Sequence, residues 1–275
     1  MTIYKALTIA GSDSSGGAGI QADLKTFQER GVYGMTALTT IVAMDPANWQ
    51  HHVFPQPADI VAAQLETILD IGVHALKTGM LGTVEIIELV ARTIEQRKLE
   101  PVVVDPVMVC KGFDEVLNPE TANSLRESLV PKSTVVTPNL FEAAQLARRG
   151  PIHTIDDMKE AAKAIHDLGA RYVLVKGGAK LQHEKAIDIL YDGRTFDILE
   201  SERIDTTYTH GAGCTYSAAI TAELAKGKPV EEAVRTAKAF ITAAIRHGFP
   251  LNRHIGPTMH AAHRLYGDPE NSFMS

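Results

Sequence analysis

The chain of 275 residues carries 33 acidic and 27 basic side chains, and 45% of its residues are hydrophobic. This length and composition predict one large globular domain over residues 1–275. The net charge of −6, with no basic run, argues against nucleic acid as a partner. Two cysteines far apart in the sequence suit a reducing cytoplasm, and we expect neither a signal peptide nor a membrane span.

Apolar runs alternate with helical patterns along the chain. Ala6–Ala10 predicts a buried strand, and a loop rich in turn-forming residues then leads into a helix from Ile20 to Arg30. Further strands are expected at 36–44, 74–77, 102–104, 134–136 and 172–175, and a hairpin at 187–191 and 196–200. Further helices are expected at 60–68, 84–96, 121–129, 140–148, 155–168, 215–225, 230–247 and 258–266. This alternation predicts an α/β fold whose mostly parallel central sheet has helices on both faces.

Polar clusters follow the expected strands where each strand ends. They are Gly11–Asp13, Thr78–Met80, Asp105, Asn139–Glu142 and Lys176–Gly178. Because ligands bind beyond the carboxyl ends of the strands in such sheets, we expect these clusters to form one site.

A glycine-rich loop at residues 205–213 leads into the expected helix that starts near Cys214. Gly211 and Gly213 allow the backbone to approach a ligand closely, and a helix N-terminus presents unpaired N–H groups to an anion. Cys214 lies in the first turn, where we expect the helix dipole to favour a thiolate. The stretch predicts group transfer involving phosphate, and the alternative is a helix start of small residues packed under a sheet.

Two carboxylates at strand ends are candidates for binding Mg²⁺, which retains most of its water and takes one or two carboxylates from a protein. They are Asp105 and Glu142. Glu142 also stands three residues after Asn139, so a capping box is the alternative interpretation. Asp105 has the alternative role of capping the segment that follows it.

Three other chemistries fit parts of the sequence less well. Gly17–Ala22 matches a dinucleotide-binding pattern, but five loop residues separate it from the strand, and no acidic residue clearly ends the second strand. His210 and Cys214 could form a thiol-hydrolase dyad, although His210 precedes the helix. The three C-terminal histidines His254, His260 and His263 are more typical of surface or capping positions than of a metal site.

Five motifs, taken together and in order, resemble the hydroxymethylpyrimidine (phosphate) kinases over nearly the whole chain. They are residues 6–26, 77–81, 104–108, 137–142 and 210–214. The resemblance implies a three-layer ribokinase-like fold, ATP and Mg²⁺ as cofactors, and phosphorylation of a hydroxymethyl group on a small nitrogen ring.

Two positions are similar to the pyridoxine/pyridoxal kinase branch of this family. Met44-Asp45 stands where the pyrimidine kinases usually have Gln-Asn, and methionine cannot hydrogen-bond an aminopyrimidine. Cys110 stands where they typically have no thiol, and we expect it on a small flap near residues 106–117. The resemblance therefore implies pyridoxal or a related vitamer as substrate. A hydroxymethylpyrimidine kinase of thiamine biosynthesis and a non-catalytic small-ligand-binding protein are the alternatives.

The resemblance also implies roles for individual residues, as well as a homodimer. The implied catalytic residues are Cys214, as base or activator of the hydroxyl, and Gly211, Ala212 and Gly213, in the loop whose backbone N–H groups would cradle the transferring phosphoryl group. The implied ATP-binding residues are Asn139, Lys176, Gly177, Gly178, Ala179, Lys180, Asp188, Gly213 and Lys238. The implied ring-site residues are Gly11, Asp23, Met44, Met80, Val107, Cys110 and His210.

Overall fold

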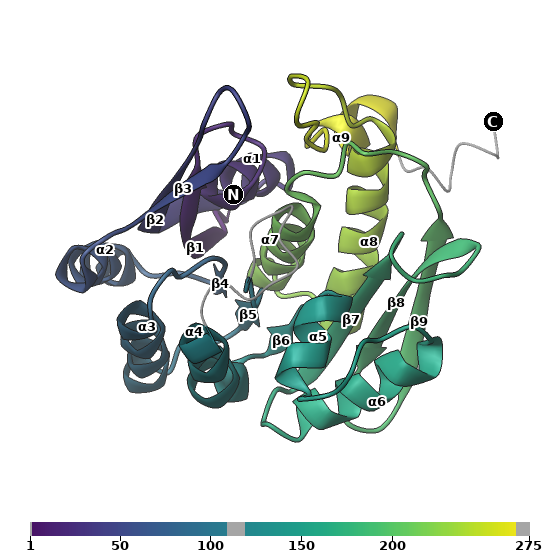
Figure 1. Cartoon of the computed structure of the whole chain (residues 1–275). Coiled ribbons are helices and arrows are strands. Elements are labelled where there is room, and N and C mark those ends of the chain that lie inside the picture. The colour runs from purple at the N-terminus through teal and green to yellow at the C-terminus, as the bar shows by residue number, and fades with distance from the viewer. Residues whose placement is uncertain (1, 109–118, 268–275) are drawn as a thin grey trace.

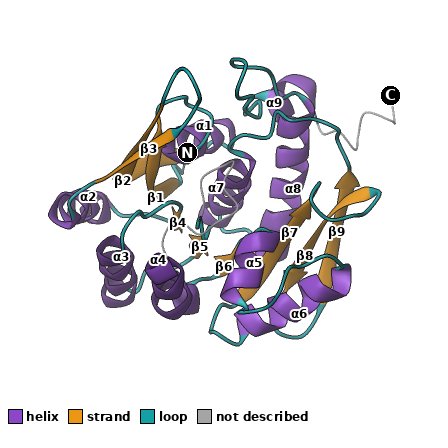
Figure 2. Cartoon of the chain, in the orientation of Figure 1, coloured by secondary structure: helices purple, strands orange, loops and turns teal. Residues whose placement is uncertain are grey.

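One continuous sheet forms the centre of the computed structural model, which describes residues 2–108 and 119–267. Its strands in spatial order are β3 (His51–Pro55), β2 (Tyr33–Met44), β1 (Lys5–Asp13), β4 (Ala75–Thr78), β5 (Val102–Val104), β6 (Val135–Val136), β7 (Tyr172–Gly178), β8 (Lys185–Tyr191) and β9 (Phe196–Glu202). Neighbours from β2 to β7 pair in parallel, whereas β3, β8 and β9 join through antiparallel pairs. The predicted, mostly parallel sheet is confirmed (Figure 2).

Helices cover both faces of this sheet (Figure 1). One face carries α1 (Gly19–Glu29), α7 (Ala212–Ala225) and α8 (Val230–Arg246), with the short α9 (Ala262–Tyr266) packed on α8. The other face carries α2 (Ala58–Ile71), α3 (Val84–Arg97), α4 (Pro119–Ser124), α5 (Leu140–Leu146) and α6 (Ile155–His166). A π-helical turn at Leu125–Leu129 and a 3₁₀ turn at Val130–Lys132 continue α4. The predicted three-layer α/β fold is therefore confirmed.

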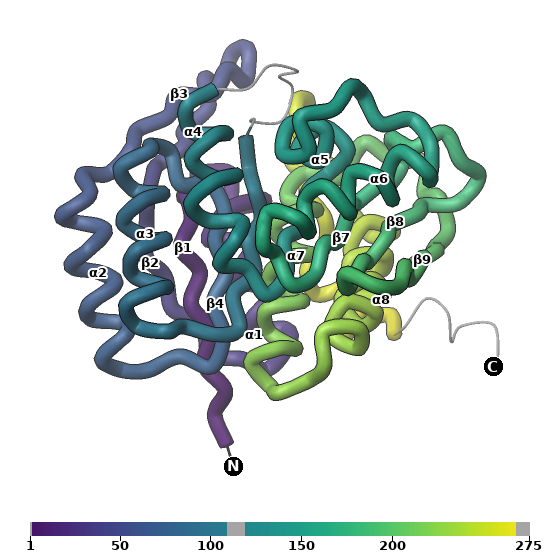
Figure 3. The backbone as a smooth tube through the Cα atoms, turned by 90° about the horizontal axis from the view of Figure 1, so that it is seen from below, coloured from purple at the N-terminus to yellow at the C-terminus, as the bar shows by residue number. Residues whose placement is uncertain are grey.

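The sheet separates two hydrophobic cores, which explains the sequence pattern of its strands. Val102 and Val104 face one core and Val103 faces the other, so all three side chains are fully buried. A strand that is buried on both faces reads as a continuous apolar run instead of an alternating one. The helix α7 is buried almost all round because it lies between the sheet, α1 and α8 (Figure 3).

Four local features differ from the sequence expectations. The edge strand β3 was not expected, since His51–Pro55 is short and half exposed and carries no run of buried apolar residues. The strand β1 continues through Gly11 to Asp13, and the expected helix 121–129 divides into α4 and a π-helical turn. The last expected helix is shorter, because α9 begins only at Ala262. Within the described ranges, every helix is too short or too polar to cross a membrane.

The topology places an opening beside β1. From β1 the chain pairs first with β2 on one side, and it later returns to place β4 on the other side. At such a reversal the loops after neighbouring strands diverge and leave a crevice. The loops that follow β1, β4, β5, β6 and β7 therefore open toward the N-terminus of α7.

Candidate active site

A cavity of about 800 Å³ lies at the carboxyl ends of the parallel strands. Its walls include every described residue that the sequence predicted for the site, with one exception. The exception is Met44, although its strand neighbour Val42 and its cross-strand partner His51 do line the cavity. Cys110 and most of the expected flap lie outside the described residues.

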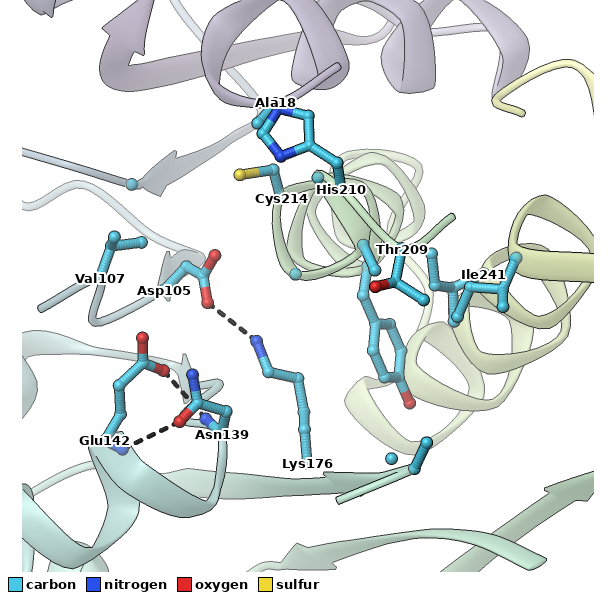
Figure 4. A pocket seen from close by; sticks show the side chains of 18 of the residues that line it. Ala18, Asp105, Val107, Asn139, Glu142, Lys176, Thr209, His210, Cys214 and Ile241 are labelled. Atoms are coloured by element: carbon cyan, nitrogen blue, oxygen red, sulfur yellow. Dashed lines mark hydrogen bonds and ion pairs between the residues drawn. The ribbon is translucent and has the colours of Figure 1, made fainter. Parts of the chain in front are cut away.

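The N-terminus of α7 forms one wall of the cavity (Figure 4). Gly211 precedes this helix with φ of 75°, and the Ala212 N–H donates to the Thr209 carbonyl at 3.1 Å. Within the described part of the chain, the N–H groups of Gly213 and Cys214 have no backbone acceptor. The predicted turn with free N–H groups is thus present. Only two of the three expected N–H donors are available, because the Ala212 N–H donates to the Thr209 carbonyl.

The side chain of Cys214 points into the cavity between His210 and Asp105 (Figure 4). Burial raises the pKa of the Cys214 thiol to about 11, and the nearby Asp23 and Asp105 carboxylates add to the effect of burial. Lys77 and the Gly19 N–H act in the opposite direction but do not outweigh them. The expectation of a thiolate favoured by the helix dipole is therefore wrong for this site, where the thiol is the main form at neutral pH.

A buried charge cluster lies opposite Cys214. The Lys176 ammonium is 3.0 Å from Asp105 Oδ1, which also accepts a hydrogen bond from the Thr137 hydroxyl at 2.9 Å. Burial alone would raise the pKa of Asp105, but Lys176 and Lys77 hold it below its usual range. Asp105 is therefore ionised, with its other oxygen 3.3 Å from the Ser217 hydroxyl.

Glu142 combines the two roles that the sequence allowed, since it caps a helix and also lines the cavity. Its Oε2 accepts the Asn139 N–H at 2.9 Å while its own N–H donates to Asn139 Oδ1 at 3.0 Å, so the capping box is present. Its carboxylate also lines the cavity near Asp105 and Lys176 (Figure 4). Burial raises the pKa of Glu142 to about 7, and the charge of Asp105 adds to this rise against Lys176. Among the described residues, no cluster of three or more His, Cys, Asp or Glu side chains could bind a metal unaided.

The expected nucleotide residues Asp188 and Lys238 form an ion pair at the far end of the cavity. Their charged atoms are 2.6 Å apart, and the second oxygen of Asp188 accepts the Gly177 N–H at 3.1 Å. Asp188 thereby ties the glycine pair at the end of β7 to α8. Gly178, Ala179 and Lys180 complete this part of the wall.

The ring-site candidate His210 is fixed by Asp13, which the sequence placed in one of the polar clusters of the site without indicating its partner. His210 Nε2 lies 2.6 Å from Asp13 Oδ2, at the end of β1, and the same carboxylate accepts the N–H groups of Ser15 and Ala18 at 2.8 Å. Burial favours a neutral Asp13, but the hydrogen bonds from His210 and Ser15 outweigh it and lower the pKa of Asp13 to about 2. This interaction joins the loop after β1 to the loop that precedes α7.

Asp23 is fully buried and is not an exposed helix residue. It accepts hydrogen bonds from the Lys77 ammonium at 2.7 Å and from the Thr8 hydroxyl at 2.6 Å. Lys77 was also missed as a site residue, although it stands in a motif that carried the family resemblance. His51 was missed because β3 itself was not expected, and its position in the sequence carried no signal.

Comparison with known proteins places the chain in a family. The family model for phosphomethylpyrimidine kinase matches residues 13–259. The chain belongs to this family. It is 67% identical to the pyridoxine kinase of Bacillus subtilis (strain 168) over 267 residues, which cover 96% of this chain and 98% of the relative. It is 42% identical to the hydroxymethylpyrimidine/phosphomethylpyrimidine kinase of the same organism, with 95% of this chain and 96% of that relative covered.

A solved structure agrees with both the fold and the sequence comparison. The pyridoxal kinase of Staphylococcus aureus in complex with AMP-PCP and pyridoxal has a TM-score of 0.91 to this chain and 51% sequence identity. The match covers 96% of this chain and 95% of that one. The fold of this chain is thus shared with a pyridoxal kinase whose structure contains AMP-PCP and pyridoxal.

Replacing Gly211 with alanine tests the anion-binding turn. An added Cβ would lie 1.8 Å from the Gly17 carbonyl oxygen, so the α7 N-terminus must shift, and binding of AMP-PCP should weaken at least tenfold by calorimetry. Gly227→Ala is the matched control, since Gly227 also has positive φ but nothing lies within 4 Å of its added Cβ. Equal affinities for Gly211→Ala and the parent would contradict the assignment.

Replacing Asp13 with asparagine tests the loop connection through pH. Because the folded pKa of about 2 lies below the usual 3.8, the carboxylate contributes about 2 kcal/mol of stability above pH 5, lost as pH falls toward 2. Asp13→Asn should therefore lower the free energy of urea unfolding by about this amount at pH 7, with the deficit shrinking at pH 3. The exposed Asp70→Asn serves as the control and should stay within about 0.5 kcal/mol of the parent. A deficit independent of pH would argue against stabilisation of the Asp13 carboxylate by its hydrogen bonds.

Proposed function

We propose that the chain is an ATP-dependent pyridoxine/pyridoxal kinase, which phosphorylates the hydroxymethyl group of vitamin B6 vitamers to give 5′-phosphates. The observation that carries this proposal is 67% identity to a pyridoxine kinase, against 42% to the pyrimidine kinase of the same organism. The cavity supports it, because the residues predicted for the nucleotide and for the ring line one continuous space at the N-terminus of α7.

The nucleotide would lie along β7, α8 and the start of α5. The residues that we propose to contact it are Asn139, Lys176, Gly177, Gly178, Ala179, Lys180, Asp188, Gly213 and Lys238. Asp188 orients the Gly177 backbone through their 3.1 Å hydrogen bond, which leaves the glycine pair open toward the cavity. Lys176 lies between this wall and the α7 turn, where an ammonium stabilises phosphate charge.

The ring site would lie on the β1 and β4 side of the cavity. Gly11, Met80, Val107 and His210 line it, and His51 from β3 adds a further wall that the sequence did not reveal. Apolar walls with few fixed polar groups suit a small aromatic ring. Met44 stands beside His51 in the β2–β3 pair, so any effect that it has on specificity would pass through that neighbour. The contact proposed for Cys110 stays a prediction.

The residues present fit Mg²⁺, since Asp105 and Glu142 offer two carboxylates and Mg²⁺ takes its other ligands from water and phosphate oxygens. When bound, the ion would neutralise charge on the ATP phosphates. Burial raises the pKa of Glu142 to about 7. A cation bound at this position would favour the ionised carboxylate and so lower that pKa.

The chemical step would occur at the N-terminus of α7. The acceptor oxygen would attack the γ-phosphorus as the bond from that phosphorus to the β,γ-bridging oxygen breaks. The hydroxyl proton would pass to the small ionised fraction of Cys214, because burial keeps most of the sulfur in the thiol form at neutral pH. The Gly213 and Cys214 N–H groups stabilise the transferring phosphoryl group, and most of the catalysis in such reactions is positioning and charge stabilisation.

We also propose a single kinase domain with a flap near 106–117, a homodimer and a cytoplasmic location. The continuous sheet and its two cores support the single domain. The family resemblance supports the homodimer, and the expectation that two distant cysteines suit a reducing compartment supports the location.

Initial rates of ADP formation test the substrate. With Mg-ATP, kcat/KM for pyridoxal or pyridoxine should exceed that for 4-amino-5-hydroxymethyl-2-methylpyrimidine by at least tenfold, because the sequence is far closer to the pyridoxine kinase. A higher value for the pyrimidine would assign the chain to the thiamine branch. No ADP formation with any alcohol would favour the non-catalytic binding protein.

Removal of the metal tests the carboxylate pair. Excess EDTA should abolish ADP formation, and Glu142→Gln should raise the Mg²⁺ concentration for half-maximal rate at least tenfold, because a charged ligand is lost. Glutamine can still cap the helix, so the fold of α5 is retained. The exposed Glu88→Gln is the control and should leave the Mg²⁺ requirement unchanged. An unchanged requirement in Glu142→Gln would exclude Glu142 as a ligand.

A further inference from the structure

The turn between β2 and β3 holds a tryptophan in a backbone conformation that bulky side chains rarely adopt. Trp49 has φ of 62°, in the left-handed region, and its N–H closes the turn by donating to the Asp45 carbonyl at 2.8 Å. Lys98 and Arg148 share this conformation, but both follow the ends of helices, where it is common. A strained residue of this size persists where the contacts around it hold it in place, and such residues often lie near functional sites.

Two contacts join this turn to the loop that follows α8. The indole of Trp49 stacks on the His254 imidazole, with ring centroids 5.6 Å apart and planes inclined by 18°. Arg253 Nη2 donates to the Ala47 carbonyl at 3.1 Å, and Arg253 Nε donates to His254 Nε2 at 2.9 Å. Arg253 thus holds both the turn and the imidazole on which Trp49 stacks, at the edge of the molecule where the β2–β3 hairpin meets this loop (Figure 1).

Packing, and not a hydrogen bond, fixes the indole in this position. The indole N–H of Trp49 is buried and has no acceptor within the part of the chain that the structure describes. The His254 ring is oriented by Arg253, so the surface on which the indole lies is itself held in place.

The same contacts connect the two segments that carry the histidines of the proposed ring site. His210 is bonded to the loop after α8, since its N–H donates to the Gly256 carbonyl at 3.1 Å and its carbonyl accepts the Thr258 N–H at 3.2 Å. His51 begins β3 two residues after Trp49. Both histidines line the cavity. Burial lowers the pKa of His51 and the charge of His210 adds to this effect, as expected for two rings that face one space.

We propose that Trp49, His254 and Arg253 form a clamp that positions His51 against His210 and so sets the width of the ring site. The clamp rests on the proposed function, because it acts on the wall that would bind the ring of the alcohol. These three described residues lie outside the cavity wall, so they are positioning residues that act through His51.

The place of β3 in the sheet explains why a clamp is needed. This strand has five residues and pairs on one side only, because it is the edge of the sheet. Such a segment opens more easily than a central strand. Without the clamp, binding of the ring would also have to order the turn and His51, and that entropic cost would weaken affinity.

Binding of a ring ligand tests the clamp. Trp49→Ala should raise the Kd of pyridoxal, measured by calorimetry, at least fivefold and leave the Kd of AMP-PCP within twofold, because the proposed nucleotide wall lies on β7 and α8. His254→Ala and Arg253→Ala remove the partners and should raise the Kd of pyridoxal in the same direction. Trp49→Phe retains an aromatic ring that can stack and should keep the Kd of pyridoxal within twofold of the parent.

A second measurement detects the clamp without any ligand. Trp49 is the only tryptophan of the chain, so its fluorescence reports on this contact alone. His254→Ala uncovers one face of the indole and should increase the acrylamide quenching constant at least twofold. A quenching constant equal to that of the parent would show that the two rings do not pack in solution and would overturn the proposal.

Tyr266→Ala is the matched control, because Tyr266 stacks on His247 with ring centroids 3.9 Å apart and both lie outside the cavity wall. It should leave both Kd values within twofold of the parent.

The hydroxymethylpyrimidine is measured in parallel, and the fivefold criterion applies to whichever ring the parent binds. A smaller change in Trp49→Ala would overturn the clamp and leave the proposed function intact, as would an equal weakening of AMP-PCP, which indicates general loosening of the cavity. A parent that binds neither ring would overturn the proposed function, and the clamp with it.

Discussion

Burial of charge at one end of the sheet is the constraint on which the site depends. Asp23, Lys77, Asp105 and Lys176 are all buried or nearly so, and each charge requires a partner in the low-dielectric interior. The partners come from different strands and from α1, so the charges fix the relative positions of those elements. Because the carboxyl ends of parallel strands lie at the same edge of the sheet, the topology brings these partners together.

The same arrangement separates two tasks within one cavity. The Lys176–Asp105 pair lines the cavity on the side of the proposed nucleotide wall, whereas the Lys77–Asp23 pair lines it on the side of the proposed ring site. Asp188 and Lys238 then anchor the far end of the nucleotide wall to α8. Phosphoryl transfer needs fixed dipoles and charges more than covalent chemistry, and these three ion pairs hold charged side chains in defined positions around the cavity.

The fold and most of the cavity wall could be predicted from the sequence. Strands such as Val102–Val104 are buried on both faces and read as apolar runs, and polar residues follow directly where the strands end. The ionisation of Cys214 could not be predicted, since it depends on carboxylates from α1 and β5 that are distant in sequence. The edge strand β3 was missed because a short, half-exposed strand needs no apolar run, and His51 was missed with it. Asp13 looked like a turn former, and only the fold places it 2.6 Å from His210.

The late position of α7 in the chain has a consequence for synthesis. Residues 5–78 supply Thr8, Asp23 and Lys77, but the cover over them is made by residues 212–225. A nascent polypeptide on the ribosome therefore carries the Lys77–Asp23 pair in contact with water until most of the message has been translated. Dehydration of the pair requires docking of α7, so this end of the cavity is completed only after residues 212–225 have been synthesised.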